Sequence, residues 1–201
     1  AGIILGNGST CDGDVNDLTL DGSSVGLGIT FQWLYGPVGG PYTTPLGNLL
    51  VQSTTGIPTG TYEVVVDVTC NAGPTTVTTI PFALTINQVP TATASNDGPI
   101  CVAGTANFTG GTDIGTDFQW SGPDGFTSTN QNPSISGLTL SNGGTYTLVV
   151  TAGGCPSTPA TTDLQVTNPP TIQSVTANPN PICANGSSVL NVNAFAELPN
   201  V

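Results

Sequence analysis

The stretches "GTYEVVVDVTC" (residues 60–70) and "GTYTLVVTAGGC" (residues 144–155) decide the fold class, because each alternates apolar and polar side chains with a period of two. In the first stretch one face carries Tyr62, Val64, Val66 and Val68, and the other carries Glu63 and Asp67. In the second stretch Tyr146, Leu148 and Val150 alternate with Thr145, Thr147 and Thr151. Turns such as "GPVGGP" (36–41) and "SNGG" (141–144) separate further short alternating runs. The sequence therefore predicts an all-β chain built from sandwiches.

Both stretches belong to a longer repeat that begins at a cysteine. Cys11 is followed by "ITFQWLYGP" (29–37), "GTYEVVVDVTC" and "IPFALTINQVP" (80–90). Cys101 is followed by "TDFQWSGPDG" (116–125), "GTYTLVVTAGGC" and "ATTDLQVTNPP" (160–170), and its own phrase "GPICVAG" (98–104) returns as "NPICANG" (180–186) around Cys183. We predict repeat units at residues 1–87 and 88–168, joined by a short Pro-containing linker. Residues 169–201 are predicted to be a linker and the start of an incomplete third unit.

Four aromatic residues recur at matching places in the two units. Trp33 and Trp120 lie on the "FQW" strands, and Tyr62 and Tyr146 stand at the entry to the "GTY" strands. They resemble the strand C tryptophan and the tyrosine corner of the immunoglobulin fold. The expected architecture is therefore a tandem of immunoglobulin-like β-sandwiches with these four side chains in their cores.

The charge of the chain is entirely negative. It has twelve Asp and Glu residues and no Lys, Arg or His, giving a formal net charge of −12. Binding to phosphates or to anionic lipids needs cations, so direct nucleic-acid binding is excluded. The longest apolar run is interrupted by Glu63 and Asp67, so we also expect no membrane insertion. Hydrophobic residues in alternating runs make up 37% of the chain, which favours a folded protein over a disordered one.

Five cysteines without any histidine favour disulfides over a zinc site, and with them an oxidising compartment. The repeat predicts the bridges Cys11–Cys70 and Cys101–Cys155. A bridge between units, for instance Cys70–Cys101, is the alternative. Cys183 is expected to pair with a residue of the third unit beyond Val201.

With "PICVAGTANFTG" (99–110), "FQWSGPDGFTSTNQNPSISGLTLSNGGTYTLVVTAGGC" (118–155) and "TTDLQVT" (161–167) laid out, the second unit resembles the immunoglobulin-like or PKD-like repeats of very large secreted surface proteins of Bacteroidota. The resemblance implies export to the cell surface and display in tandem arrays, as in adhesins, gliding-motility filaments or multidomain enzymes. It implies no single biochemical activity, because function lies in sites and not in folds.

The densest acidic segment is "CDGDVNDLTLDG" (11–22). Asp12, Asp14 and Asn16 have the alternate spacing of a calcium loop. Asp17, however, stands where an EF-hand needs glycine, and Ser23 stands where it needs a bidentate glutamate. The segment is thus either an exposed acidic turn or a weak calcium site formed by Asp12, Asp14, Asn16 and Asp17, and no other cofactor is expected.

Catalysis is not expected. Without His or Lys the usual general bases and Schiff-base chemistry are absent, and a carboxylate pair would have to use Glu63, Glu197 or an aspartate. We expect a non-catalytic structural segment of an extracellular array, an adhesin stalk or spacer. Its expected partners are neighbouring repeats of the same or an identical chain, including self-assembly into a filament. The alternatives are a glycan- or protein-binding module using loop aromatics at Tyr35, Tyr42 and Phe126, and an accessory region of a secreted enzyme.

Overall fold

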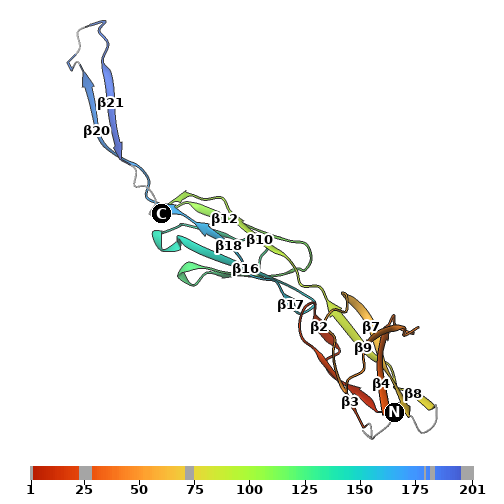
Figure 1. Cartoon of the computed structure of the whole chain (residues 1–201). Helices are drawn as coiled ribbons and strands as arrows, with labels where there is room; N and C mark the ends of the chain where they lie inside the picture. The colour runs from red at the N-terminus through yellow and green to blue at the C-terminus, as the bar shows by residue number, and fades with distance from the viewer. Residues whose placement is uncertain (1, 23–28, 71–74, 179, 182–183, 196–201) are drawn as a thin grey trace. The chain divides into compact units, whose positions relative to one another are not determined.

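The structure is a computed structural model that describes the whole chain except residues 1, 23–28, 71–74, 179, 182–183 and 196–201. Its regular elements are strands, apart from two 3₁₀ turns, η1 (Pro123–Gly125) and η2 (Leu140–Asn142), so the all-β prediction is confirmed (Figure 1). Within the described ranges, no helix has the length and apolar character needed to cross a membrane. The chain divides into two compact units, Ala1–Pro90 with Thr151–Pro156, and Thr91–Val150 with Ser157–Val201.

The first unit contains two sheets. One is antiparallel, in the order β1-β3-β6, with β1 at Ile3–Leu5, β3 at Asp17–Asp21 and β6 at Val51–Ser53. The other has the order β2-β9-β7-β4-β5, with β2 at Ser9–Cys11, β9 at Phe82–Asn87, β7 at Gly60–Cys70, β4 at Ile29–Gly36 and β5 at Thr44–Gly47. Strand β8 (Thr75–Thr78) also pairs with β7, and β2 runs parallel to β9. The "GTY" strand β7 is therefore paired with β4 and β9 on its two sides.

The core of this unit is formed by the inward faces of the two sheets. Its buried residues are Ile4, Leu18, Leu20, Trp33, Ile57, Val64, Val66, Leu84 and Ile86. Tyr62 and Val68 are partly buried and pack against this core, as the alternation along β7 requires. The indole N–H of the fully buried Trp33 donates to the backbone carbonyl of Leu49 over 2.6 Å, so its single polar group is satisfied.

The second unit repeats this arrangement. One sheet has the order β10-β12-β15, with β10 at Ala92–Asn96, β12 at Thr105–Thr112 and β15 at Ser134–Ser136. The other has the order β14-β13-β16-β17, with β14 at Thr127–Ser128, β13 at Asp117–Ser121, β16 at Gly144–Ala152 and β17 at Cys155–Pro156. Strand β18 (Ala160–Leu164) also pairs with β16, and β11 (Ile100–Cys101) runs parallel to β19 (Val166–Thr167).

The second core is built around aromatic side chains. Its buried residues are Ala106, Phe108, Trp120, Leu138, Tyr146, Leu148, Val150 and Leu164. The indole N–H of Trp120 donates to the carbonyl of Gln131 over 3.2 Å, and the Tyr146 hydroxyl donates to the carbonyl of Asn142 over 2.8 Å. The ring of Tyr146 lies against the backbone of Gly122, where a Cβ atom would come within 2.3 Å of it. Glycine at that point of the "SGPDG" turn is therefore required by packing.

The last two strands form an antiparallel hairpin, β20 (Thr171–Asn178) and β21 (Val189–Phe195), whose described side chains are exposed or half-buried. The predicted ranges 1–87, 88–168 and 169–201 concern sequence repeats and stay predictions. The compact units differ from them chiefly in Thr151–Pro156, which falls in the second sequence repeat but in the first compact unit.

Candidate functional site

The disulfide of the structure joins Cys11 to Cys155, which are 144 positions apart, while Cys70 and Cys101 are free and exposed. The predicted bridges Cys11–Cys70 and Cys101–Cys155 are therefore wrong, and the alternative Cys70–Cys101 does not form either. Cys183 lies outside the described residues.

The pairing registers explain the error. Cys11 lies opposite Asn87 at the end of β9, beside Gly60 at the start of β7, whereas Cys70 ends β7. Ten residues of strand span about 33 Å, while bridged cysteines need Cα atoms within about 7 Å. In the second unit Cys101 lies opposite Thr167, near the start of β16, and Cys155 follows the end of that strand. In both repeats the two cysteines lie at opposite ends of the "GTY" strand.

The acidic segment at residues 11–22 does not converge on one point. Asn16 is buried, and its amide nitrogen donates to the carbonyl of Asn7 over 2.9 Å. Asp17 is exposed on β3, and Asp12 and Asp14 lie in the exposed turn after Cys11. In the part of the chain that the structure describes, no three His, Cys, Asp or Glu residues are grouped to hold a metal ion. The geometry gives the calcium hypothesis no support.

The three aromatic residues expected on binding loops are only partly exposed, because each has an internal partner. Tyr35 lies in β4 and makes an edge-on contact with Tyr62, at 5.5 Å between ring centroids. Phe126 packs against Phe108 and Tyr146 as part of the second core. Tyr42 donates its hydroxyl to the carboxylate of Glu63. All three rings are therefore half-buried and have partners within the fold, and a binding role for them stays a prediction.

Glu63, the carboxylate weighed for catalysis, is held in its ionised form. It accepts hydrogen bonds from the Tyr42 hydroxyl and from the Gly39 backbone N–H, the latter at 3.0 Å. The bond from Tyr42 and then that from Gly39 lower the pKa of Glu63, and the same bond to Glu63 raises the pKa of Tyr42. An acceptor with a lowered pKa is poorly suited to act as a general acid. Glu197 lies outside the described residues.

Asp97 offers a direct test of this kind of electrostatics. The Asp97 carboxylate accepts hydrogen bonds from the backbone N–H of Asn107 at 2.8 Å and from the side-chain amide of Asn107 at 2.7 Å. Both bonds lower the pKa of the Asp97 carboxyl, and the bond from the backbone N–H has the larger effect. The pKa of Asp97 is lower in the folded chain than in the unfolded chain. The bonds from Asn107 therefore stabilise the fold above the unfolded pKa of about 3.9, and this stabilisation is lost as the pH falls through the folded pKa.

We expect Asp97→Asn to flatten the decline of the melting temperature below pH about 4, because the variant has no carboxylate at this position to protonate. A ¹³C NMR titration should show the Asp97 pKa rising in Asn107→Ala, and an unchanged pKa would contradict the assignment.

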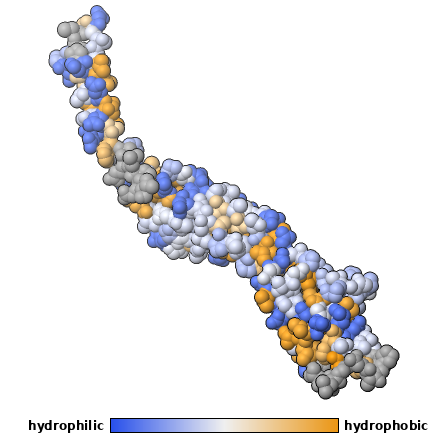
Figure 2. Space-filling model, viewed as in Figure 1, coloured by the Kyte–Doolittle hydropathy of each residue, from blue (hydrophilic) through white to orange (hydrophobic). Residues whose placement is uncertain are grey.

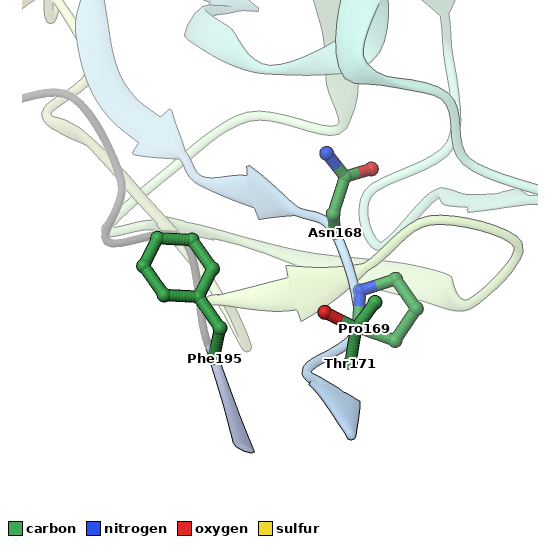
Figure 3. Close-up of a pocket in the computed structure, with 4 residues that line it drawn as sticks. All are labelled: Asn168, Pro169, Thr171 and Phe195. Carbon is green, nitrogen blue, oxygen red and sulfur yellow. The ribbon is translucent and has the colours of Figure 1, made fainter. Parts of the chain in front are cut away.

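A pocket of about 300 Å³ lies at the base of the β20–β21 hairpin. Its lining residues are Asn168, Pro169, Thr171 and Phe195, with the rings of Pro169 and Phe195 on opposite sides (Figure 3). None of these four side chains ionises, so they supply neither an acid nor a base. The lining offers apolar contact and a few neutral hydrogen-bonding groups.

The hairpin itself has one apolar and one polar face. In the register Val175 lies opposite Val192, Ala177 opposite Leu190 and Ile172 opposite Ala194, and directly opposed residues share a face. We call this set the apolar hairpin face: Ile172, Val175, Ala177, Leu190, Val192 and Ala194. Its four large side chains are 56–67% exposed, and Figure 2 shows apolar side chains gathered along one side of the hairpin. The other face is mostly polar: it carries Ser174, Thr176, Asn178, Asn191 and Asn193, with the exposed Val189 and Phe195 at its two ends.

The sequence predicts a linker and the start of a third unit at residues 169–201, but this face was not identified from it. The signal was the alternation of Leu190, Val192 and Ala194 with Asn191 and Asn193. The matching pattern in β20 is broken, because the register shifts between Ile172 and Ser174. A bulge of that kind cannot be placed from one strand alone.

No protein-family model matches the chain, and no curated protein matches it. Solved structures do resemble it. A marsupial T cell receptor is 12% identical, with 87% of this chain and 76% of that chain covered and a TM-score of 0.54. The fibronectin(III)-like modules of Clostridium thermocellum CbhA are 10% identical over 82% of this chain and 94% of that chain, with a TM-score of 0.41. Murine CEACAM1b is 11% identical, with 82% of this chain and 100% of that chain covered and a TM-score of 0.43. The fold is therefore immunoglobulin-like, and likeness at this level of identity says nothing more.

Proposed function

We propose that this chain is a non-catalytic structural segment of an extracellular surface array, of the kind found in the Bacteroidota surface proteins that its second unit resembles. An immunoglobulin-like fold is compatible with a binding module or a structural module. Two observations favour the structural role. The aromatic residues considered for binding are engaged internally, and the disulfide suits an oxidising, extracellular compartment.

The observation that carries the proposal is the apolar hairpin face. Leu190 stands seven positions after Cys183, as Phe108 stands seven positions after Cys101. Phe108 belongs to β12, which pairs with β10, and it is buried in the second core. The β20–β21 hairpin is thus the counterpart of the β10–β12 pair, and its equivalent apolar face is exposed. A contiguous exposed apolar face of this kind is typical of a surface that contacts another one.

A second copy of the chain is the occupant we propose for this face. All twelve carboxylates lie outside residues 164–196, so the hairpin is the uncharged part of a chain that otherwise repels its own copies. Two identical apolar faces can pack against each other about a twofold axis. Strands of this length present a face of roughly 25 by 10 Å, which places the contact at the weak end of specific interfaces.

Val192→Asp should abolish this self-association. An aspartate on each of two facing hairpins would bring like charges together in a desolvated contact, so we expect at least about a tenfold weakening of dimerisation. Asn191→Asp adds the same charge on the polar face and should have little effect. Sedimentation equilibrium of both variants in a Cys70→Ser, Cys101→Ser and Cys183→Ser background would measure the change while the Cys11–Cys155 bridge stays intact. A wild-type chain that stays monomeric at high concentration, or equal weakening by the two variants, would contradict self-assembly through the hairpin.

A further inference from the structure

The two free cysteines occupy positions whose counterparts in the other unit are bonded. Cys101 ends β11 as Cys11 ends β2, and β11 runs parallel to β19 as β2 runs parallel to β9. The next residue donates its N–H to the carbonyl opposite the cysteine in both cases. Asp12 donates to Asn87 at 2.8 Å, and Val102 donates to Thr167 at 2.9 Å. Cys101 therefore has the same backbone setting as the bonded Cys11.

Cys70 and Cys155 lie in hairpins that are closed by matching bonds. The N–H of Val66 donates to the Thr79 hydroxyl at 2.9 Å, and the N–H of Val150 donates to the Ser157 hydroxyl at 3.1 Å. The N–H of Thr79 also donates to the Val66 carbonyl, and the N–H of Ser157 donates to the Val150 carbonyl. Beyond these bonds, Cys155 lies on the return strand of the short tip Thr151–Pro156, whereas Cys70 ends the outgoing strand β7, opposite Thr75 of β8. Each hairpin thus holds one cysteine beyond its closing bonds.

The existing bridge is thus a bond between two kinds of position, a parallel-strand cysteine and a hairpin-tip cysteine. The tip around Cys155 is seated beside β9, because a Cβ on Gly153 would lie 3.0 Å from the side-chain oxygen of Asn87. In the existing bridge a parallel-strand cysteine is therefore bonded to a cysteine at the tip of a β-hairpin that is seated beside it.

We propose that Cys101 is the attachment site for a hairpin-tip cysteine from another unit of the same type, and that Cys70 of a second copy of this chain can supply it. The inference rests on the proposed function, because it requires other units of this kind nearby. Among the described residues each chain has one open position of each type, Cys101 and Cys70, and this makes the contact head-to-tail. Such contacts propagate into an open linear assembly unless the geometry closes a ring.

The chemistry is a thiol–disulfide exchange. Oxidised glutathione first converts Cys70 into a mixed disulfide and releases one glutathione. The Cys101 thiolate then attacks the Cys70 sulfur, the bond to glutathione breaks, and the Cys70–Cys101 bond forms. The second glutathione leaves as a thiolate and takes up the proton that Cys101 gave to solvent. The two electrons of the two cysteine thiols thus end on two reduced glutathione molecules, and both cysteines are exposed for the reaction.

The test mixes two variants in a Cys183→Ser background, one with Cys70→Ser and the other, ¹⁵N-labelled, with Cys101→Ser. In a glutathione redox buffer the first offers only Cys101 and the second only Cys70, beside the intact Cys11–Cys155 bridge. Random pairing gives about twice as many heterodimers as either homodimer, and we expect at least about a tenfold excess, with the Cys70–Cys101 link identified by peptide mapping. A random proportion, or no cross-linking, would overturn the proposal.

The same mixture with Val192→Asp in both variants separates this inference from the proposed hairpin contact. An excess of heterodimers that persists there supports the cysteine pairing even if the hairpin contact fails. Reversible self-association is measured without reductant, in a Cys70→Ser, Cys101→Ser and Cys183→Ser background. If it is intact while the cysteine pairing is random, the result counts against the Cys101 site and not against the hairpin contact.

Discussion

Replacing Cys11 by serine is expected to lower the free energy of unfolding by as much as about 5 kcal/mol. The Cys11–Cys155 bridge closes a loop with a sequence separation of 144, and the chain-entropy model gives a stabilisation of that order for so long a loop. The loss would be a large share of the roughly 5 to 15 kcal/mol that stabilises an ordinary domain. Urea unfolding of oxidised protein, followed by circular dichroism, would measure it.

Cys70→Ser is the matched control, because Cys70 is exposed and unbonded in the structure. It should change the free energy of unfolding by no more than about 0.5 kcal/mol. Reductant should destabilise the wild type and leave the Cys11→Ser variant unchanged. If Cys70→Ser were as damaging as Cys11→Ser, the bridge would be the Cys11–Cys70 pair that the repeat predicted, and the structure would be wrong at this point.

The period-two pattern was sufficient to locate the cores. Alternation along the "GTY" strands places Val64, Val66, Leu148 and Val150 inward, and all four are fully buried. Burial of one face is a property of the strand itself, so it can be inferred from local sequence. The burial of Trp33 and Trp120 was likewise predicted from their strands, because a large indole on a short alternating strand is best accommodated between the two sheets.

The disulfide could not be inferred in the same way. Cysteine pairing depends on which strand ends come together, and those are set by registers such as Cys11 with Asn87 and Gly60 with Ile86. The repeat favoured pairing within each unit, whereas strands of eleven and nine residues separate the two cysteines of the first and second unit. The internal contacts of the aromatic side chains could not be inferred from the sequence for a related reason. Partners such as Phe108 for Phe126 come from distant strands, and sequence distance conceals them.

Trp120→Ala is expected to cost about 3 to 5 kcal/mol of stability, with the loss falling on the second core. The side chain is fully buried and lies 5.6 Å from Phe108 between ring centroids, so truncation leaves a cavity in the middle of an aromatic cluster. It also removes the indole donor that satisfies the Gln131 carbonyl. Urea unfolding by circular dichroism would measure the loss, and Trp33 would remain as the fluorescent reporter of the first unit.

Two further variants separate the cavity from other causes. Trp120→Phe keeps most of the apolar volume but not the N–H, so it should cost clearly less than Trp120→Ala. Leu140→Ala removes an apolar side chain that is 55% exposed in η2 and should cost no more than about 0.5 kcal/mol. Equal losses for Trp120→Ala and Leu140→Ala would mean that the indole is not the centre of the second core. The loss of stability should therefore be largest for Trp120→Ala, smaller for Trp120→Phe and smallest for Leu140→Ala. This order follows because the loss depends on how much apolar volume is removed from a packed space that cannot collapse.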